Sequence, residues 1–259
     1  MPPPPVTPEQ ARKCGERLVE IALDRIVGKG FKQKEQRLAL TYGGLIVRAA
    51  RFVRAAYLLA DNQLRPEAAV FVRALIEYAI TARWLALEPP KNFTLWAIDD
   101  MRGRLLIAEA AKRLAGVDLL EDERRREYEE TQATLQGDWL AAFGEPAPKR
   151  MPSLERRARE TGNHGLYEFA YRFDSQTAVH PTPFAVDQIL GQTDDMIEVL
   201  GEPSADREYA DPYATAAVAF LDILDAAASV TPELVFGDEV DQIRRILHGE
   251  HPANQSDTA

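Results

Sequence analysis

The sequence lacks most of the motifs that identify an enzyme class. Its one cysteine, Cys14, excludes an intramolecular disulfide, and its four histidines are too scattered to predict a zinc site. It has no glycine-rich phosphate loop after a strand and no nucleophile elbow. We therefore expect no metal and no cofactor.

The sequence is also short of positive charge. Its net charge is −10, and its isoelectric point is about 5.0, which argues against a broad nucleic-acid-binding surface but still allows a local basic cleft. The N-terminus has no charged and apolar leader of the secretory type. The most apolar stretch, 214–230, contains Asp222 and Asp225, which favours a core helix over a membrane span. We expect a cytoplasmic protein without a membrane partner.

Alanine, leucine, glutamate and arginine dominate the chain, and alternating stretches of β-branched residues are scarce. This composition predicts an all-α fold, organised as a single multi-helix bundle. Residues 7–248 are expected to form one helical domain, between a disordered proline-rich N-terminus at 1–6 and a flexible tail at 249–259. Residues 188–200 fit either a short β-hairpin or two helical turns, and the hairpin is slightly favoured.

Local start and stop signals predict the individual helices. Thr7, Pro8 and Gln10 form a capping box that begins the first helix, and the glycines at 28 and 30 end it near Val27. Apolar spacing, prolines and glycines place further helices at about 31–62, 66–88, 92–115, 119–142, 153–161, 166–179 and 211–230, with a last segment from Thr231 to about His248.

Three arginines recur at every third position of the second predicted helix, at 48, 51 and 54. They fit either a solvated helix face or the wall of an anion-binding cleft. Gly43 and Gly44 lie in the middle of the same helix. They could kink it or allow another helix to approach closely.

The segment 68–80 is apolar on nearly all sides, and its charges are Arg73 and Glu77. A spacing of four places both on one stripe, which Trp84 also shares. The sequence therefore predicts a guanidinium and a carboxylate side by side in the core. They would form either an internal ion pair or a pocket wall in which Arg73 holds an anion that Glu77 orients.

A second polar cluster lies in and after the helix predicted at 166–179. Tyr171 and Ser175 lie beside its apolar stripe, Arg172 is three residues before Ser175, and His180 is expected at the helix end, before Pro181. A histidine at this position either caps the helix or exchanges a proton near neutral pH. Together with an arginine and a hydroxyl group, it could hold a phosphate.

The two clusters together resemble a prokaryotic helical family of unknown function, on the pattern Arg73-x3-Glu77, Trp84, and Tyr171-Arg172-x2-Ser175-x3-Val179-His180-Pro181. That family is similar to the HEPN superfamily, whose helical domains are common in toxin–antitoxin and phage-defence systems. Many of these are metal-independent ribonucleases with an arginine and a histidine from paired subunits. The resemblance assigns these roles to Arg172 and His180, which seven residues separate, a wider gap than in that superfamily.

Two functional hypotheses follow. In the first, the protein is a metal-independent ribonuclease or phosphodiesterase, with Arg172, His180 and Glu77 as catalytic residues and Arg73, Ser175 and Tyr171 as substrate-binding residues. In the second, it is a non-catalytic helical module that binds a small anionic ligand or a partner protein. The partners that these hypotheses allow are RNA or a small anion, and a second copy of the chain in a homodimer.

Overall fold

The computed structural model describes residues 6–32, 36–172, 175, 190–192, 197–199 and 211–249. The fold is all-α with one two-stranded hairpin. In chain order, the elements are α1 (Pro8–Ile26), α2 (Arg37–Asp61), α3 (Arg65–Leu87), α4 (Pro89–Ala115), α5 (Asp122–Phe143), α6 (Leu154–Glu160), α7 (His164–Leu166), the π-helix η1 (Tyr167–Tyr171), β1 (Leu190–Gln192), β2 (Ile197–Val199), α10 (Pro212–Val230) and α11 (Asp238–Leu247).

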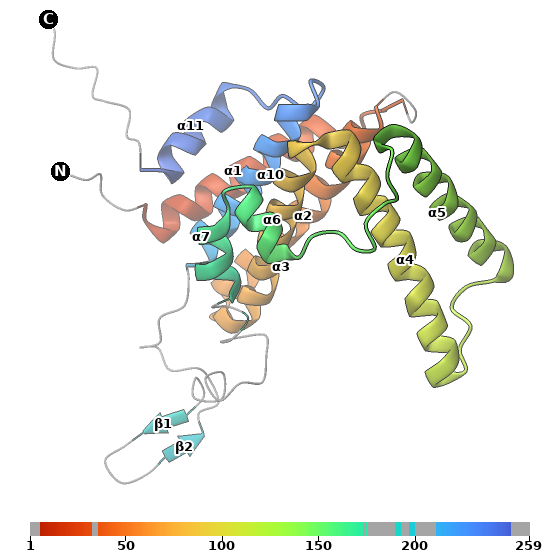
Figure 1. Cartoon of the computed structure of the whole chain (residues 1–259). Helices are drawn as coiled ribbons and strands as arrows, with labels where there is room; N and C mark the ends of the chain where they lie inside the picture. The colour runs from red at the N-terminus through yellow and green to blue at the C-terminus, as the bar shows by residue number, and fades with distance from the viewer. Residues whose placement is uncertain are drawn as a thin grey trace, which may run out of the picture.

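Four helices, α1, α2, α3 and α10, pack side by side and form the centre of the molecule (Figure 1). Small residues on these helices allow close packing, and many of their alanines are fully buried. Gly15 on α1 lies directly against Tyr57 on α2, whose hydroxyl donates to the Tyr213 carbonyl on α10 at 3.0 Å. Three of the four central helices are thus joined at one point.

The helix boundaries follow the local signals closely. Thr7 and Gln10 form the predicted capping box at the start of α1. Gly116 and Gly144, both in the left-handed region, end α4 and α5. The predicted start of the last segment at Thr231 is corrected, because the last helix, α11, begins at Asp238 after Gly237. Thr231 instead ends α10, where its hydroxyl is bonded to the Ala227 carbonyl.

Helices α4 and α5 form an antiparallel pair that projects away from the central helices (Figure 1). The short helix α6 then returns to the centre and packs on α3. The chain continues through α7 into η1, so the helix predicted to start at 166 already begins at His164. Residues 176–189, with the predicted helix end at His180, lie outside the described part of the chain.

The hairpin predicted near 188–200 is confirmed for its described residues. Strands β1 and β2 are antiparallel, and Leu190 pairs with Val199 and Gln192 with Ile197.

Helix α10 is the one described helix long and apolar enough to cross a membrane by length and composition alone. Half of its most apolar window is buried inside the protein, between α1, α2 and α3. Its two aspartates, Asp222 and Asp225, bind Arg83 on α3 and Arg244 on α11. These contacts identify α10 as the core helix that its acidic residues predicted.

Candidate functional site

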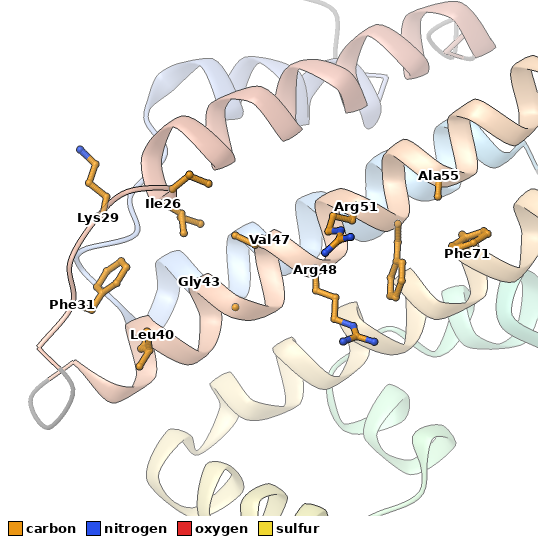
Figure 2. A pocket seen from close by; sticks show the side chains of 13 residues that line it. Ile26, Lys29, Phe31, Leu40, Gly43, Val47, Arg48, Arg51, Ala55 and Phe71 are labelled. Atoms are coloured by element: carbon orange, nitrogen blue, oxygen red, sulfur yellow. The ribbon is translucent and has the colours of Figure 1, made fainter.

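A groove of about 840 Å³ lies between the end of α1, the loop that follows it, and one face of α2. We call it the α1–α2 groove. Figure 2 shows its lining, with Phe31 and Lys29 from the loop at one end and Phe71 from α3 at the other. The residues between them are Ile26, Val27 and, on α2, Leu40, Gly43, Gly44, Val47, Arg48, Arg51, Phe52 and Ala55. Its volume lies within the range of small-molecule sites, roughly 300–1,000 Å³.

Two glycines of α2 shape this groove in different ways. A Cβ at Gly43 would lie 3.4 Å from Ile26 Cγ2, so Gly43 lets α1 approach α2 closely. At Gly44 a Cβ would meet nothing within 4 Å, so Gly44 leaves the groove open. The helix runs unbroken through both. Of the two alternatives, close helix contact is therefore observed and a break in the helix is not.

Three cations line this largely apolar groove. Arg48 and Arg51 lie one turn apart on α2, and Lys29 lies near Phe31 (Figure 2). Within the described part of the chain, none of the three has a carboxylate at ion-pair distance. By contrast, Arg12, Arg17, Arg83 and Arg244 each bind one or more carboxylates. In a chain with 41 acidic and 31 basic residues, this is a local positive region with free hydrogen-bond donors.

Aromatic rings hold the arginine end of the groove in place. The Arg48 guanidinium lies over the Phe52 ring, 5.8 Å from its centroid. Phe52 in turn contacts Phe71 at 6.0 Å and Tyr78 at 5.5 Å between ring centroids. Burial raises the pKa of Tyr78, and the charge of Arg48 opposes this effect. Both arginines thus lie on a helix and not on a loop, and the Arg48 guanidinium packs on this cluster of aromatic rings.

The two sequence clusters meet where α3 packs on η1, and we call this contact the block junction. Arg73 Nη2 donates to the Tyr171 hydroxyl at 2.8 Å, and its guanidinium lies 4.7 Å from the centroid of that ring. The Arg73 Nε is buried and has no hydrogen-bond partner among the described residues. Tyr171 also stacks on Tyr167, with centroids 5.2 Å apart. One residue from each sequence cluster, Arg73 and Tyr171, is therefore in contact with the other.

The predicted pairing of Arg73 with Glu77 is wrong. Arg73 is half-buried, but Glu77 is exposed, and no ion pair joins them in the described structure. Burial lowers the pKa of the Arg157 guanidinium, and Glu77 lies near enough to oppose this effect in part. The segment 68–80 is therefore a helix with one exposed edge and not a helix buried on all sides.

Of the remaining predicted site residues, Arg172 and Ser175 lie in the described part of the chain. Ser175 is buried, and its hydroxyl donates to the Tyr171 carbonyl at 2.6 Å, which satisfies it within the helix. Arg172 is exposed and binds Glu168 at 2.9 Å, one turn earlier. His180 lies outside the described residues. Arg172 and Ser175 therefore have local partners, and within the described residues neither is hydrogen-bonded to Arg73 or Glu77.

Sequence reasoning missed Arg157, a buried arginine beside the block junction. Its Nη1 donates to the Thr81 hydroxyl at 2.6 Å, and its Nε donates to the Pro152 carbonyl at 3.1 Å. It also lies over the Trp84 ring, 5.9 Å from the centroid. Nothing in the sequence separates Arg157 from its exposed neighbours Arg156 and Arg159. The groove residues Phe31 and Phe71 were missed as well, because they come from other elements than the arginines.

The fold and these two polar regions define an all-α helical domain with one cationic groove and one arginine–tyrosine junction. The chain belongs to a family of unknown function, DUF5677, whose family model matches residues 41–197. This match covers the arginine face of α2 and both sequence clusters. No curated protein and no solved structure matches the chain.

Proposed function

We propose that the protein is a non-catalytic helical module that binds a small organic anion with an apolar body in the α1–α2 groove. The observation that carries this proposal is the presence of Lys29, Arg48 and Arg51 in a largely apolar groove, where none of them has a carboxylate partner among the residues that the structure describes. The anionic group of the ligand contacts the arginines, and its apolar part lies against the aliphatic and aromatic wall.

The physical chemistry of the groove favours such a mixed ligand over a simple ion. An exposed ion pair in water contributes little, typically about 0–1 kcal/mol. Burial of an aliphatic or aromatic group against Val47, Phe31 and Phe52 adds about 25 cal/mol for each Å² removed from water. Two arginines on one helix also offer several planar donors, which suit a carboxylate, sulfonate or phosphate group.

Isothermal titration calorimetry with dodecanoate and with 8-anilinonaphthalene-1-sulfonate tests this proposal. We expect both probes to bind, and inorganic phosphate alone to bind far more weakly, because it lacks the apolar body. Replacing both groove arginines, Arg48→Ala with Arg51→Ala, should weaken probe binding by roughly tenfold or more, as expected when charge-assisted hydrogen bonds are lost.

Arg54→Ala is the matched control. Arg54 continues the three-residue spacing on α2 and is exposed like Arg48 and Arg51, but it does not line the groove. It should therefore leave the affinity unchanged. Absence of binding by both probes, or equal affinity of the wild type and the double variant, would contradict the proposal.

A second proposal is the metal-independent ribonuclease of the HEPN-like type, acting in the cytoplasm in a defence or toxin–antitoxin setting. The contact between Arg73 and Tyr171 supports it, because this contact joins the two sequence clusters that carry the resemblance. Arg172 would stabilise the charged transition state, and His180 would act as general acid or base on the RNA.

The two proposals give different results in one set of experiments. A ribonuclease should cleave RNA without added metal, and His180→Ala should abolish cleavage while probe binding in the α1–α2 groove continues. Equal cleavage by the wild type and His180→Ala would remove the ribonuclease proposal and leave the binding module unaffected.

A further inference from the structure

Helix α4 has an exposed apolar stripe on its outer half. Leu106, Ile107 and Leu114 have exposed fractions of 57%, 64% and 80%. Ala110 lies between them on the same face and Gly103 lies just before them, at helical spacings of three and four residues. Single exposed leucines are ordinary in proteins, but a continuous stripe along one helix indicates an interaction surface.

The stripe faces away from α5. The opposite side of α4 carries the buried Ala108 and Lys112, whose ammonium binds Asp118 in the connection to α5. Figure 1 shows that the α4–α5 pair projects from the central helices, so these helices do not cover its outer half. Gly103 and Ile107 also line a hollow of about 310 Å³ along this face, together with Trp96.

The charges along one edge of the stripe are self-complementary. In chain order this edge reads Asp99, Arg102, Leu106, Glu109 and Arg113, which is acid, base, apolar, acid, base. Asp99 and Arg113 each lie seven residues from Leu106, and Arg102 and Glu109 lie four and three residues from it. If a second copy of this edge runs in the opposite direction with Leu106 facing Leu106, each acidic residue of one copy lies opposite a basic residue of the other.

Two of these charges have no partner within their own chain. Glu109 and Arg113 are exposed, and neither makes an ion pair in the described structure. A two-fold axis at Leu106 brings α4 of a second copy alongside in the antiparallel direction, with the same edge of both helices in contact. Arg113 then faces Asp99 of the second copy, and Glu109 faces its Arg102. Asp99 and Arg102 are partly exposed and lie 3.8 Å apart in their own chain, where Asp99 also accepts from Met151 N at 3.3 Å, so the second copy adds a partner to each.

We propose that the protein forms a homodimer through the outer face of α4, packed antiparallel on the same face of a second copy, with Leu106 on the two-fold axis. Gly103 and Ala110 allow the two helices to approach closely. Leu114 of each copy then lies opposite position 98 of the other, at the Trp96 end of the hollow. The apolar stripe supplies the binding energy, and the charged edge fixes the antiparallel direction.

Disulfide trapping tests the position of the axis and the helix direction together. Leu106→Cys should form an intermolecular disulfide rapidly under mild oxidation, because the two new thiols meet at the axis. Leu114→Cys should not, although this position is more exposed, since the two thiols would lie about 24 Å apart along the helices. The wild type controls for Cys14, which is buried and should not cross-link.

Sedimentation velocity at micromolar concentration tests the association itself. The wild type should sediment as a dimer, and Leu106→Glu should sediment as a monomer with an unchanged helical circular-dichroism spectrum. Leu58→Glu is the matched control, because Leu58 is 65% exposed on α2, far from this face, and should stay dimeric. A monomeric wild type, a dimeric Leu106→Glu, or equally fast cross-linking at Leu114 would overturn the proposal.

Discussion

At the scale of single residues, the close contact between Gly15 and Tyr57 shows how tightly the central helices are packed. An added Cβ at Gly15 would lie 1.9 Å from the Tyr57 hydroxyl oxygen. The tyrosine cannot turn away, because it is buried and bonded to the Tyr213 carbonyl. Burial also raises its pKa strongly, so the hydroxyl stays protonated and continues to donate.

We predict that Gly15→Ala lowers the free energy of unfolding by about 2 kcal/mol, as is typical of an overpacked core. Adding Tyr57→Phe removes the overlapping oxygen but leaves the ring Cζ 2.8 Å from the added Cβ, so Gly15→Ala should cost less stability in the Tyr57→Phe background than in the wild type. Urea unfolding of the three variants measures this coupling. Simple additivity of the two single changes would show that the contact does not exist.

The bond between Arg73 and Tyr171 gives a second prediction for single residues. Tyr171→Phe keeps the ring under the guanidinium but removes its hydrogen bond, which should cost about 1 kcal/mol of stability. Tyr167→Phe is the matched control, because its stacked ring is adjacent and its hydroxyl makes no hydrogen bond in the described structure. Thermal unfolding should distinguish the two variants, and equal midpoints would contradict the contact.

Glu77 shows why residue environments were only partly predictable. The apolar composition of 68–80 predicts burial on all sides, and most of this segment is indeed buried. The exposed edge at Glu77 depends on how far α2, α6 and η1 extend around α3, and these elements are distant in sequence. The contact between Arg73 and Tyr171 could not be predicted either, because the spacing within each cluster does not specify which residues of the two clusters meet.

At the scale of elements, α10 is held among its neighbours by partly buried ion pairs. The Asp222 carboxylate accepts from Arg83 and, at 2.9 Å, from Asn163. Asp225 accepts from Arg244 at 2.5 Å and so attaches α11. Burial nevertheless raises the pKa of Asp222 above its ordinary value of 3.8, although Arg83 and Asn163 act in the opposite direction.

This raised pKa predicts a pH dependence of stability with a definite sign. The folded state holds the Asp222 proton more tightly than the unfolded chain, so the stabilisation is complete below pH 3.8 and is lost as the pH rises through the raised pKa. Urea unfolding measures this effect as the free energy of unfolding of the wild type minus that of Asp222→Asn. This difference should fall as the pH rises. A difference that grows as the pH rises would contradict the raised pKa.

The elements themselves were predictable wherever a local signal marked them. The capping box at Thr7, the glycines at 116 and 144 and the prolines at 89 and 90 each set a boundary within a few residues. The start predicted at Thr231 was wrong, although Thr-Pro is a helix-start signal. Here the threonine ends α10, and the next helix begins only after Gly237. A helix start and a helix end can use the same polar residue.

At the scale of the whole molecule, the chain is acidic, but the α1–α2 groove is lined by cations that have no carboxylate partner among the described residues. The three-residue spacing of Arg48 and Arg51 allowed a solvated face or an anion site, and the sequence alone did not decide between them. The apolar walls support the proposed anion site, because Phe31 and Phe71 come from two other elements to line the same groove. Such a site forms only after α1, α2 and α3 have packed.

Salt gives a further prediction at this scale. The groove cations are exposed to solvent, so the attraction between them and the anionic probe is screened by added salt. Dodecanoate affinity should therefore fall as sodium chloride is raised, and the fall should be smaller for the variant with both Arg48→Ala and Arg51→Ala. Calorimetry at low and high salt measures the two slopes, and parallel slopes would show that the anion binds elsewhere.

The most direct test of the groove is calorimetric titration of Gly44→Leu with dodecanoate, together with its thermal unfolding. A side chain at 44 has open space in front of it, and leucine forms helices better than glycine, by up to about 1 kcal/mol. We predict a protein that unfolds at a higher temperature than the wild type and no longer binds dodecanoate. A stabilised variant that binds as tightly as the wild type would contradict the account.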